Sequence, residues 1–318
     1  MSSSSPRIVV AEKYSDSAMA RLRACGEVVE LESCDDAAIR AALADADALL
    51  VRTYTHVTSE LLQSGPNLKV VGRAGVGVDN IDLIAAKDQG VIVVHTPAAS
   101  TQSVAEHAVG LMIALEHRFI ASDAALRDGM FVEHRNVAKW RELSDCRLGI
   151  IGMGRIGSRV GRICAAGLGM DVVYNDIRAI EIEGFNADSV SLDALLETAD
   201  IVSLHVPLTS QTRGLINAER LAQMKPTSLL VNTSRGAVVD NVALANALRK
   251  SALAGAALDV FEEEPLPASH PLMSAPRTIL TPHVAGRSAA ALMRMNDVVD
   301  DVIAVLGGNP PRHPAQIQ

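Results

Sequence analysis

The stretch RLGIIGMGRIG, at residues 147–157, decides how the rest of the chain can fold. Its apolar first half is long enough for a buried strand, and it leads into a G-x-G-x-x-G formed by Gly152, Gly154 and Gly157. In a dinucleotide-binding unit, the first glycine permits a tight strand-to-helix turn, the second lets the backbone approach a pyrophosphate, and the third lets helix pack on strand. The N-terminus of the following helix then offers free N–H groups to the phosphates.

The residues after this turn supply the context that the motif requires. A helix is predicted over 158–168 and a second strand over 170–175, which ends at Asp176, about 20 positions past the last glycine. A carboxylate there can accept hydrogen bonds from ribose hydroxyls and would repel a 2′-phosphate, which favours NAD over NADP. Arg178 weakens this preference, because it could pair with that phosphate.

Length and composition limit the class of protein. The 318 residues have room for two domains, and 48% of them are hydrophobic. The formal net charge of −8 argues against nucleic-acid or membrane partners, which need a basic face. The polar start at Ser2–Pro6 is unlike a signal peptide, and no apolar run is long enough to span a membrane. The four cysteines lack metal-binding spacing, which predicts free thiols, no metal site and a cytoplasmic location: Cys25, Cys34, Cys146 and Cys164.

Short apolar segments alternate with helical spacing along the chain, which predicts βαβ units and parallel sheets. In the first hundred residues, strands are expected at 7–11, 27–31, 48–51, 67–72 and 91–94, with helices near 17–24 and 35–44. A long apolar helix over 103–117 follows. Further strands are expected at 148–151, 171–175, 200–205, 228–232, 255–259 and 278–280, and a last helix over 289–306 is expected to return to the first domain.

Residues 121–145 interrupt this alternation. They are more polar than their surroundings and hold the only tryptophan, Trp140. Such a segment fits an arm that packs on a second subunit, with a solvated excursion within the monomer as the alternative.

Three stretches in the second half combine a strand end, a turn and a charged residue: 232–236, 259–265 and 281–283. Ligands of open α/β sheets bind outside the carboxyl ends of the strands, so the three stretches are expected to face one crevice. Hydride transfer between nicotinamide and a 2-oxo acid needs a cation for the carboxylate and a proton donor for the carbonyl oxygen. Arginine, histidine and a supporting glutamate suit these tasks. The spacing permits such roles for Arg235, Glu264 and His283, but structural roles remain equally open.

Several motifs occur in an order that resembles the D-isomer-specific 2-hydroxyacid dehydrogenases, with the phosphoglycerate dehydrogenase branch closest in look. They are GRAGVGVDNID at 72–82, SVAEH at 103–107, the glycine turn, HVPLT at 205–209, and the stretches 232–240, 255–265 and 281–283. The resemblance implies two Rossmann-like, doubly wound parallel-sheet domains with the active site in the cleft between them. Residues 1–99 with 287–318 would bind substrate, residues 100–286 would bind NAD, and a homodimer would form largely through the nucleotide domain.

The resemblance also assigns roles to residues. Arg235 would bind and polarise the substrate, His283 would be the acid/base, and Glu264 would pair with His283. The substrate would further be held by Arg52, Arg73, Gly75, Val76 and Gly77, the last three through backbone N–H groups. The cofactor would be contacted by Gly152, Gly154, Arg155, Ile156, Gly157, Asp176, Val206, Pro207, Thr212, Thr233, Ser234, Arg235, Asp259, His283 and Gly286.

Departures from the phosphoglycerate dehydrogenase pattern keep the substrate open. The chain stops near residue 318, so the C-terminal regulatory domains of the long enzymes are not expected. Thr53 and Tyr54 replace residues that are more often small in that branch, so the substrate is 3-phosphoglycerate, hydroxypyruvate, glyoxylate or another short acid of this type. An NAD-sensing, corepressor-like binding protein on the same fold is the alternative, because such proteins keep Arg235, Glu264 and His283. Glu264 speaks against formate dehydrogenases, which carry glutamine there.

Overall fold

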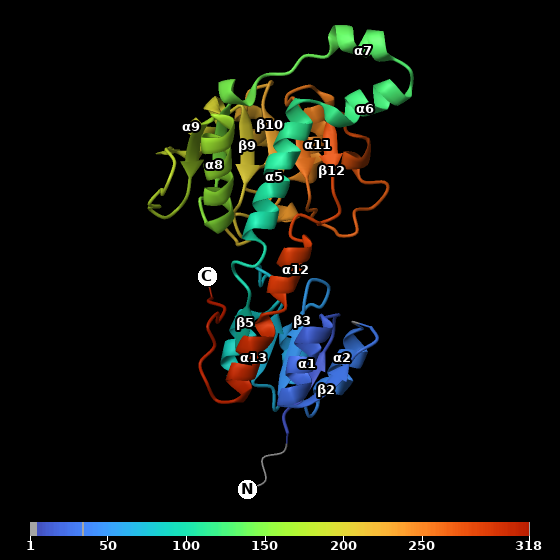
Figure 1. Cartoon of the computed structure of the whole chain (residues 1–318), viewed down its shortest axis with the longest axis vertical. Coiled ribbons are helices and arrows are strands. Elements are labelled where there is room, and N and C mark those ends of the chain that lie inside the picture. Colours follow the sequence, from blue (N-terminus) through green and yellow to red (C-terminus); the bar gives the residue numbers. More distant parts are fainter. Residues whose placement is uncertain (1–4, 34, 318) are drawn as a thin grey trace. The chain divides into compact units, whose positions relative to one another are not determined.

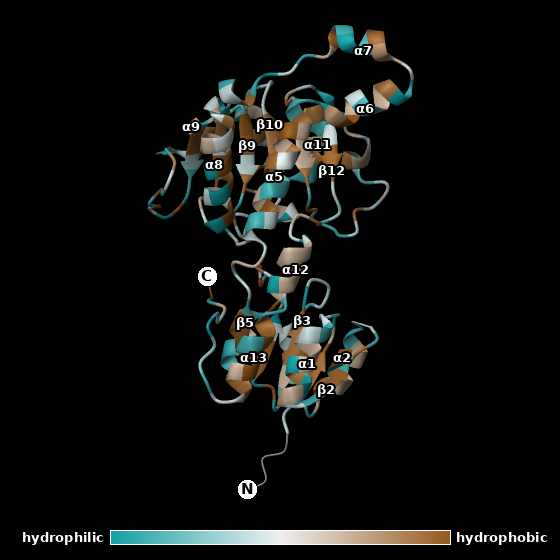
Figure 2. Cartoon of the chain, in the orientation of Figure 1, coloured by the Kyte–Doolittle hydropathy of each residue, from teal (hydrophilic) through white to brown (hydrophobic). Residues whose placement is uncertain are grey.

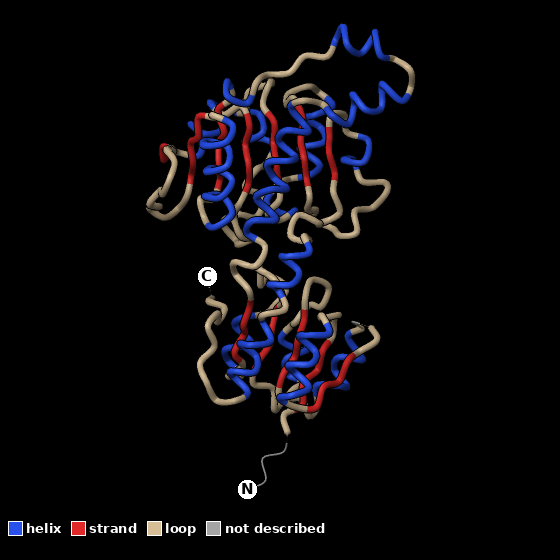
Figure 3. Tube along the Cα trace, viewed as in Figure 1, coloured by secondary structure: helices blue, strands red, loops and turns tan. Residues whose placement is uncertain are grey.

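The structure is a computed structural model that describes residues 5–33 and 35–317, so that Ser2, Ser3, Ser4 and Cys34 lie outside the described residues. The chain divides into two compact units. Unit 1 consists of residues 1–100 and 287–318, and unit 2 of residues 101–286. Each unit is a parallel sheet flanked by helices (Figures 1 and 3).

Unit 1 is a five-stranded parallel sheet in the order β2-β1-β3-β4-β5. Its order reverses between β1 and β3, as in flavodoxin-like sheets. The elements are β1 (Arg7–Val10), α1 (Asp16–Cys25), β2 (Glu27–Glu30), α2 (Asp36–Leu43), β3 (Ala48–Val51), α3 (Ser59–Gln63), β4 (Val70–Arg73), α4 (Leu83–Asp88), β5 (Ile92–His95), α12 (Ala289–Met295) and α13 (Val298–Leu306).

Both faces of the unit 1 sheet are covered. Val9, Leu49 and Val71 pack in one cluster with side chains of α2, α3 and α4, whereas Ile8 and Leu50 pack in the other with side chains of α1 and α13. Strands that are buried on both faces must be apolar at successive positions, which explains runs such as ALLV in β3. Figure 2 shows these strands as the most hydrophobic part of the unit.

Unit 2 is a seven-stranded parallel sheet in the order β12-β11-β10-β9-β6-β7-β8. The order reverses between β6 and β9, which is the Rossmann arrangement. The elements are α5 (Thr101–Glu116), α6 (Phe119–Arg127), α7 (Phe131–Val137), η1 (Leu143–Asp145), β6 (Arg147–Ile151), α8 (Arg155–Leu168), β7 (Asp171–Asn175), β8 (Asp188–Ser189), α9 (Leu192–Thr198), β9 (Ile201–Leu204), α10 (Ala218–Gln223), β10 (Leu229–Asn232), η2 (Gly236–Val238), α11 (Asn241–Arg249), β11 (Gly255–Leu258), η3 (Pro271–Ser274) and β12 (Thr278–Leu280).

The two faces of this sheet also have separate cores. Leu148 and Ile150 belong to a cluster with side chains of α5 and α8, and Val202 and Leu230 belong to a cluster with side chains of α9, α10 and α11. The prediction of two doubly wound parallel sheets is therefore confirmed. None of the helices described in either unit is long and apolar enough to cross a membrane.

The structure corrects the prediction of a single last helix over 289–306. The helix is broken into α12 and α13, and Asn296 lies between them, 6% exposed. The Asn296 side chain donates to the carbonyl of Leu292 and accepts from the backbone N–H of Ser15. The apolar spacing continues across the break, so the sequence pattern alone did not reveal it. The short edge strand β8 was also missed, and α8 begins at Arg155 rather than Ser158.

Residues 117–140, which we call the arm, carry α6 and α7 away from the sheet of unit 2 (Figure 1). Both ends of the arm are tied together by one ion pair. Glu116 Oε1 accepts the backbone N–H of Arg141 at 2.9 Å, and its Oε2 accepts from Arg141 Nη2 at 2.7 Å. Next to this pair, the rings of His117 and Trp140 stack with centroids 5.4 Å apart. Burial raises the pKa of Glu116, but the bonds from Arg141 outweigh it and lower the pKa overall.

Candidate active site

The glycine turn follows β6 at the reversal of strand order in unit 2. Gly152 has φ +92°, and a Cβ placed on it would lie 2.7 Å from the His205 carbonyl oxygen. A Cβ on Gly157 would lie 2.1 Å from the Gly152 carbonyl oxygen. A Cβ on Gly154 would meet only the guanidinium of Arg178, at 3.9 Å. The chain's own packing therefore requires Gly152 and Gly157, whereas the space beside Gly154 is open to a ligand.

Three further features of this end of the sheet suit a dinucleotide. Helix α8 starts directly after Gly154, and no side chain caps it, so its first N–H groups can bind an anion. The buried hydroxyl of Thr233 has no hydrogen-bond partner among the described residues. Val206 lies against the glycine turn, with Cγ1 2.8 Å from the Cβ position of Gly152. The residues present thus fit a dinucleotide cofactor.

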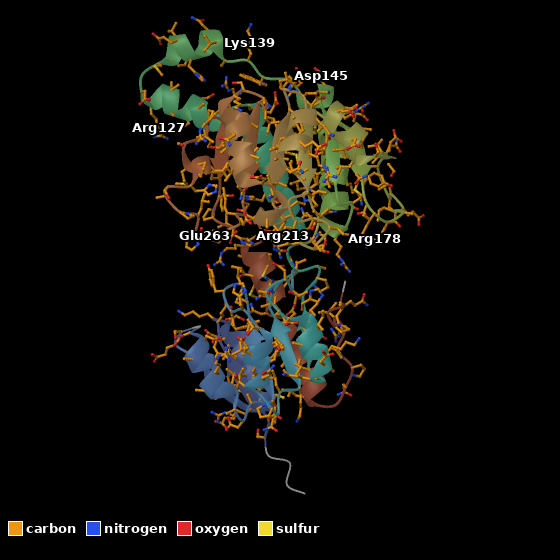
Figure 4. The ribbon with its side chains drawn as sticks, turned by 180° about the vertical axis from the view of Figure 1, so that it is seen from behind. Arg127, Lys139, Asp145, Arg178, Arg213 and Glu263 are labelled. Carbon is orange, nitrogen blue, oxygen red and sulfur yellow. The ribbon has the colours of Figure 1, made fainter. Side chains whose placement is uncertain are left out.

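Asp176 follows β7, and its side chain is 7% exposed. Its Oδ2 accepts the backbone N–H of Met153 in the glycine turn at 2.8 Å, and its Oδ1 accepts the N–H of Arg178 at 2.9 Å. Arg178 Nε lies 3.4 Å from the same Oδ1, and the arginine side chain is 66% exposed. Figure 4 shows Arg178 at the same end of unit 2 as Arg213 and Glu263, with Asp145 at the opposite end. The residue that favours NAD and the one that weakens this preference are therefore in contact.

Asn232 organises the turn that carries Arg235. It ends β10 and is fully buried. Its Oδ1 accepts the N–H of Ser234 at 3.0 Å and the hydroxyl of Ser234 at 2.8 Å, and its Nδ2 donates to the Arg235 carbonyl at 2.9 Å. A Cβ on Gly236 would lie 1.8 Å from the Phe261 carbonyl carbon. Glycine at 236 thus lets the Arg235 turn approach the loop that follows β11.

His283 and Glu264 form a hydrogen-bonded pair. Glu264 Oε2 lies 2.8 Å from His283 Nδ1, and Oε1 accepts the N–H of Phe261 at 3.0 Å. Burial alone would raise the pKa of Glu264. The bonds from His283 and Phe261, with the charges of His283 and Arg235, outweigh burial and leave the pKa below its usual value. An ionised carboxylate accepts only, so the pair keeps a proton on Nδ1 and leaves Nε2 for proton exchange.

Asp259 holds the turn that carries His283. It is fully buried, and its Oδ1 accepts from the Thr281 hydroxyl at 2.6 Å and from Val284 N–H at 2.9 Å, while its Oδ2 accepts from Ala285 N–H at 2.8 Å. His283 adopts φ +52° in this turn, a left-handed conformation that is uncommon outside glycine. The carboxylate therefore stabilises a strained backbone.

Other predicted cofactor residues lie nearby in the sequence or the sheet. The Thr212 hydroxyl donates to the carbonyl of Pro207 at 2.6 Å, which closes the loop after β9. Ser234 takes part in the Asn232 turn, and Gly286 is the last residue of unit 2. His107 of α5 was not singled out from the sequence; its Nε2 lies 3.2 Å from Thr281 Oγ1 and 3.6 Å from Asp259 Oδ1.

The predicted substrate residues of unit 1 lie at or just after the ends of β3 and β4. Arg52 lies over the ring of Tyr14, with Cζ 5.8 Å from the centroid. The loop of Arg52 is built on Glu12, which sequence reasoning missed. Its carboxylate accepts the backbone N–H groups of four successive residues at 2.8 to 3.4 Å: Arg52, Thr53, Tyr54 and Thr55. Glu12 lies two residues after the end of β1, at the point where the strand order of unit 1 reverses.

The glycine-rich loop of unit 1 follows β4. Gly75 has φ +154°, and its N–H donates to the carbonyl of Arg73 at 2.9 Å. Of the three N–H groups that the sequence predicts for substrate binding, that of Gly75 is thus already used within the chain. No backbone carbonyl of the described residues accepts the N–H of Val76 or Gly77.

The structure thus connects the predicted residues within each unit. In unit 2, the turns after the neighbouring strands β10, β11 and β12 are joined through Gly236, Glu264 and Asp259. In unit 1, Arg52 follows β3, Arg73 ends the neighbouring strand β4, and the Gly75 loop comes after it. No group of three or more potential metal-ligating side chains occurs within residues 5–33 and 35–317. The roles of these residues in binding and catalysis remain predictions.

Comparison with known proteins gives the family. The family model for the D-isomer specific 2-hydroxyacid dehydrogenase, NAD binding domain, matches residues 109–285. A glyoxylate reductase of Thermofilum pendens is 40% identical over 316 residues, covering 96% of this chain and 93% of that protein. A D-3-phosphoglycerate dehydrogenase of Mycobacterium leprae is 39% identical over 95% of this chain, which spans only 57% of that longer protein.

Solved structures agree with this assignment. D-Lactate dehydrogenase from Aquifex aeolicus, complexed with NAD and lactic acid, has a TM-score of 0.87 and 31% identity, covering 95% of this chain and 96% of that one. NADPH-dependent glyoxylate/hydroxypyruvate reductase from Sinorhizobium meliloti, in complex with NADP and malonate, has a TM-score of 0.86 and 31% identity, covering 98% and 97%. The resemblance first seen in the motifs is confirmed, and the chain is an oxidoreductase that belongs to the D-isomer specific 2-hydroxyacid dehydrogenase family.

Proposed function

We propose that the chain interconverts short 2-oxo acids and D-2-hydroxy acids with NAD(H) as cofactor. The observation that carries this proposal is the 2.8 Å contact between His283 Nδ1 and Glu264 Oε2, on loops next to the turn of Arg235. Likeness to a glyoxylate reductase along 93% of its length supports glyoxylate or hydroxypyruvate as substrate. A phosphorylated acid of the 3-phosphoglycerate type is the alternative substrate, and the test below distinguishes it from glyoxylate and hydroxypyruvate.

The chain's own residues would control charge and protons in this reaction. Bound NADH supplies the hydride. Arg235 would grip the substrate carboxylate at two points, because its guanidinium is planar and permanently charged. His283 would donate the proton on Nε2 to the substrate oxygen during reduction and take it back during oxidation. Glu264 would stabilise the imidazolium at Nδ1. We assign further anchoring of the substrate to Arg52, Arg73 and the loop of Gly75, Val76 and Gly77.

Asp176 supports the choice of NAD. Its carboxylate is nearly buried at the end of β7, and a 2′-phosphate beside it would meet a negative charge. Arg178 is in contact with that carboxylate, so part of the positive charge of Arg178, which could attract a 2′-phosphate, is already compensated. We therefore expect a preference for NADH over NADPH.

We also propose that the protein is a homodimer, with the arm as part of the interface. The arm exposes large apolar side chains, each 46% to 70% accessible, which a second copy would cover: Phe119, Ile120, Leu126, Met130, Phe131, Val132, Val137 and Trp140. Phe131→Glu should shift the protein towards monomer in sedimentation analysis, whereas Met273→Glu, at an apolar residue outside the arm that is 54% exposed, should not.

The unpaired thiols of Cys25, Cys146 and Cys164 favour a cytoplasmic location.

The test is oxidation of NADH and of NADPH with glyoxylate, hydroxypyruvate, pyruvate and 3-phosphohydroxypyruvate. We expect turnover with glyoxylate or hydroxypyruvate, a D-configured product where a stereocentre forms, and a kcat/KM at least about tenfold higher with NADH. Arg235→Lys keeps the charge but loses the two-point grip, so it should retain NADH binding and lose most turnover. Tight NADH binding without turnover on any acid would contradict the proposal and favour a nucleotide-sensing protein.

A further inference from the structure

The chain after α13 returns to the sheet of unit 1. Residues 309–315, which we call the tail, run antiparallel to β5, the edge strand, through a bridge between Val94 and Pro314. His95 N–H donates to the His313 carbonyl at 3.1 Å, and Ala315 N–H donates to the Val93 carbonyl at 2.8 Å. The tail lies on the same side of unit 1 as β5 in Figure 1. The tail therefore covers the open edge of this sheet.

A buried carboxylate anchors the tail. Asp301 of α13 has a side chain that is 5% exposed. It accepts the backbone N–H of Arg312 at 2.7 Å and that of His313 at 3.1 Å, and its Oδ2 also lies 3.1 Å from His313 Nδ1. A buried carboxylate is expensive without donors, and here the donors come mainly from the tail. Asp301 and the tail thus hold one another in place.

The strand that the tail covers ends in contact with the glycine-rich loop. His95 Nδ1 lies 2.8 Å from the Val76 carbonyl oxygen, and Thr96 N–H donates to the Gly75 carbonyl at 3.1 Å. A carbonyl oxygen only accepts, so His95 carries a proton on Nδ1. Two successive carbonyls of the loop are therefore fixed from the end of β5. This fixes the orientation of the peptide units that carry the N–H groups of Val76 and Gly77.

We propose that His95 is a positioning residue for substrate binding and that the tail, locked by Asp301, sets the position of His95. The proposal rests on the proposed function, in which the loop of Gly75, Val76 and Gly77 binds the substrate carboxylate. The buried carboxylate fixes the tail, the tail fixes the end of β5, and the imidazole fixes the Val76 carbonyl. The loop is then preorganised before the substrate arrives, so less ordering is needed on binding.

Three variants and one control test this chain of contacts. His95→Ala removes the donor to Val76, and His95→Asn keeps a short N–H donor at the same place. Asp301→Ala releases the tail. Asp300→Ala is the control, because Asp300 is the neighbouring residue on α13 and pairs with Arg21 rather than with the tail. For each protein we measure KM and kcat for glyoxylate and hydroxypyruvate, the Kd for NADH, and hydrogen exchange of peptides that cover 74–80 and 91–96.

We expect His95→Ala and Asp301→Ala to raise KM about tenfold, the effect of one lost hydrogen bond to a preorganised loop. The Kd for NADH should stay within about twofold and kcat within about threefold. Exchange should rise at 74–80 in both variants, and at 91–96 in Asp301→Ala. His95→Asn should recover most of the parental KM, and Asp300→Ala should match the parent.

A parental KM in His95→Ala, or a His95→Asn as impaired as His95→Ala, overturns the role of His95. Unchanged exchange at 74–80 in a folded Asp301→Ala overturns the role of the tail. Should Asp301→Ala not fold, Asp301→Asn takes its place with the same exchange measurement. Failure of the proposed function looks different, because the parental protein would then show no turnover with any 2-oxo acid, while the exchange results would still report on the contacts.

Discussion

The two sheets end differently at the points where their strand orders reverse. In unit 2 the turn after β6 leaves space beside Gly154, and the uncapped start of α8 follows it. In unit 1 the loop after β3, on the other side of the reversal, offers four successive N–H groups, and Glu12, two residues after the end of β1, accepts all of them. The same topology therefore produces an anion site that is open in one unit and closed by the protein's own carboxylate in the other. A strand-order reversal indicates where a ligand can bind, and local side chains decide whether one does.

The largest expected effect concerns the open end of unit 2. His283→Ala removes the proposed proton donor and should lower kcat by about 10² to 10⁴. NADH binding should remain, since the glycine turn is untouched. His134→Ala is the control, because His134 lies on the arm and contacts Ser122. Steady-state kinetics and NADH titration check this, and an unchanged kcat would remove His283 from the reaction.

Removing the carboxylate that closes the site of unit 1 should lower the stability of the protein. Glu12→Ala leaves four backbone N–H groups without their acceptor and should lower the free energy of unfolding by about 1 to 3 kcal/mol. Glu30→Ala, which breaks only the exposed pair with Arg23, should change it by about 0 to 1 kcal/mol. Urea denaturation measures both. Equal effects would mean that Glu12 does not close the loop, and the contrast between the units would be lost.

Gly154 and Gly157 of the same motif are expected to be glycine for different reasons, the first to leave room for a ligand and the second to allow packing within the chain. Gly154→Ala should raise the Kd for NADH about tenfold with little change in Tm, because its Cβ meets nothing nearer than 3.9 Å. Gly157→Ala should destabilise the fold by about 1 to 3 kcal/mol, because its Cβ would overlap the Gly152 carbonyl. Calorimetry with and without NADH distinguishes them. A destabilised Gly154→Ala would show that this space is not reserved for a ligand.

Asp176→Ala tests whether Asp176 makes the open site of unit 2 prefer NADH to NADPH. Loss of the carboxylate should raise KM for NADH about tenfold, because the ribose hydroxyls lose an acceptor, and should lower KM for NADPH, because the 2′-phosphate no longer meets a negative charge. The ratio of the two KM values is the measurement. Equal changes with both nucleotides would remove Asp176 from nucleotide selection.

The smallest expected effect is a shift with pH. Glu264→Gln removes the carboxylate that accepts from His283 Nδ1, so the pH dependence of stability should change. The folded pKa of Glu264 is lowered, so its contribution is present above the ordinary glutamate value of about 4.3 and is lost as pH falls through the folded pKa. The stability difference between parent and variant should therefore shrink below about pH 4. A pH profile identical to the parent's would argue against the pair.

The sequence was most informative where a local structure requires one type of residue, as a tight turn requires glycine and a buried strand requires apolar side chains. The glycine turn, the apolar strands and the strand ends at Asn232, Asp259 and Thr281 were predicted, because packing on both faces and tight turns leave local patterns. The break between Met295 and Val298 was not, because a buried Asn296 is bonded to Ser15, far away in the sequence.

The supporting residues of the site were harder to find for the same reason. Glu12 reaches residues about forty positions away, and His95 and Asp301 act on segments that only the fold brings near. Such contacts are set by three-dimensional register and leave no periodic signal. Asn232 differs, since it bonds to its own turn, and an asparagine at a strand end before a turn is a signal that could have been recognised.

The ion pair between Glu116 and Arg141 has a consequence for how this protein can vary. The two residues bring the entry and exit of residues 117–140 to one place, so the length of that excursion is not dictated by the sheet. Because the closure is made at the base, insertions or deletions beyond it should leave the nucleotide-binding strands undisturbed. The projecting segment can thus diverge freely to suit a different assembly, while the catalytic scaffold is inherited intact.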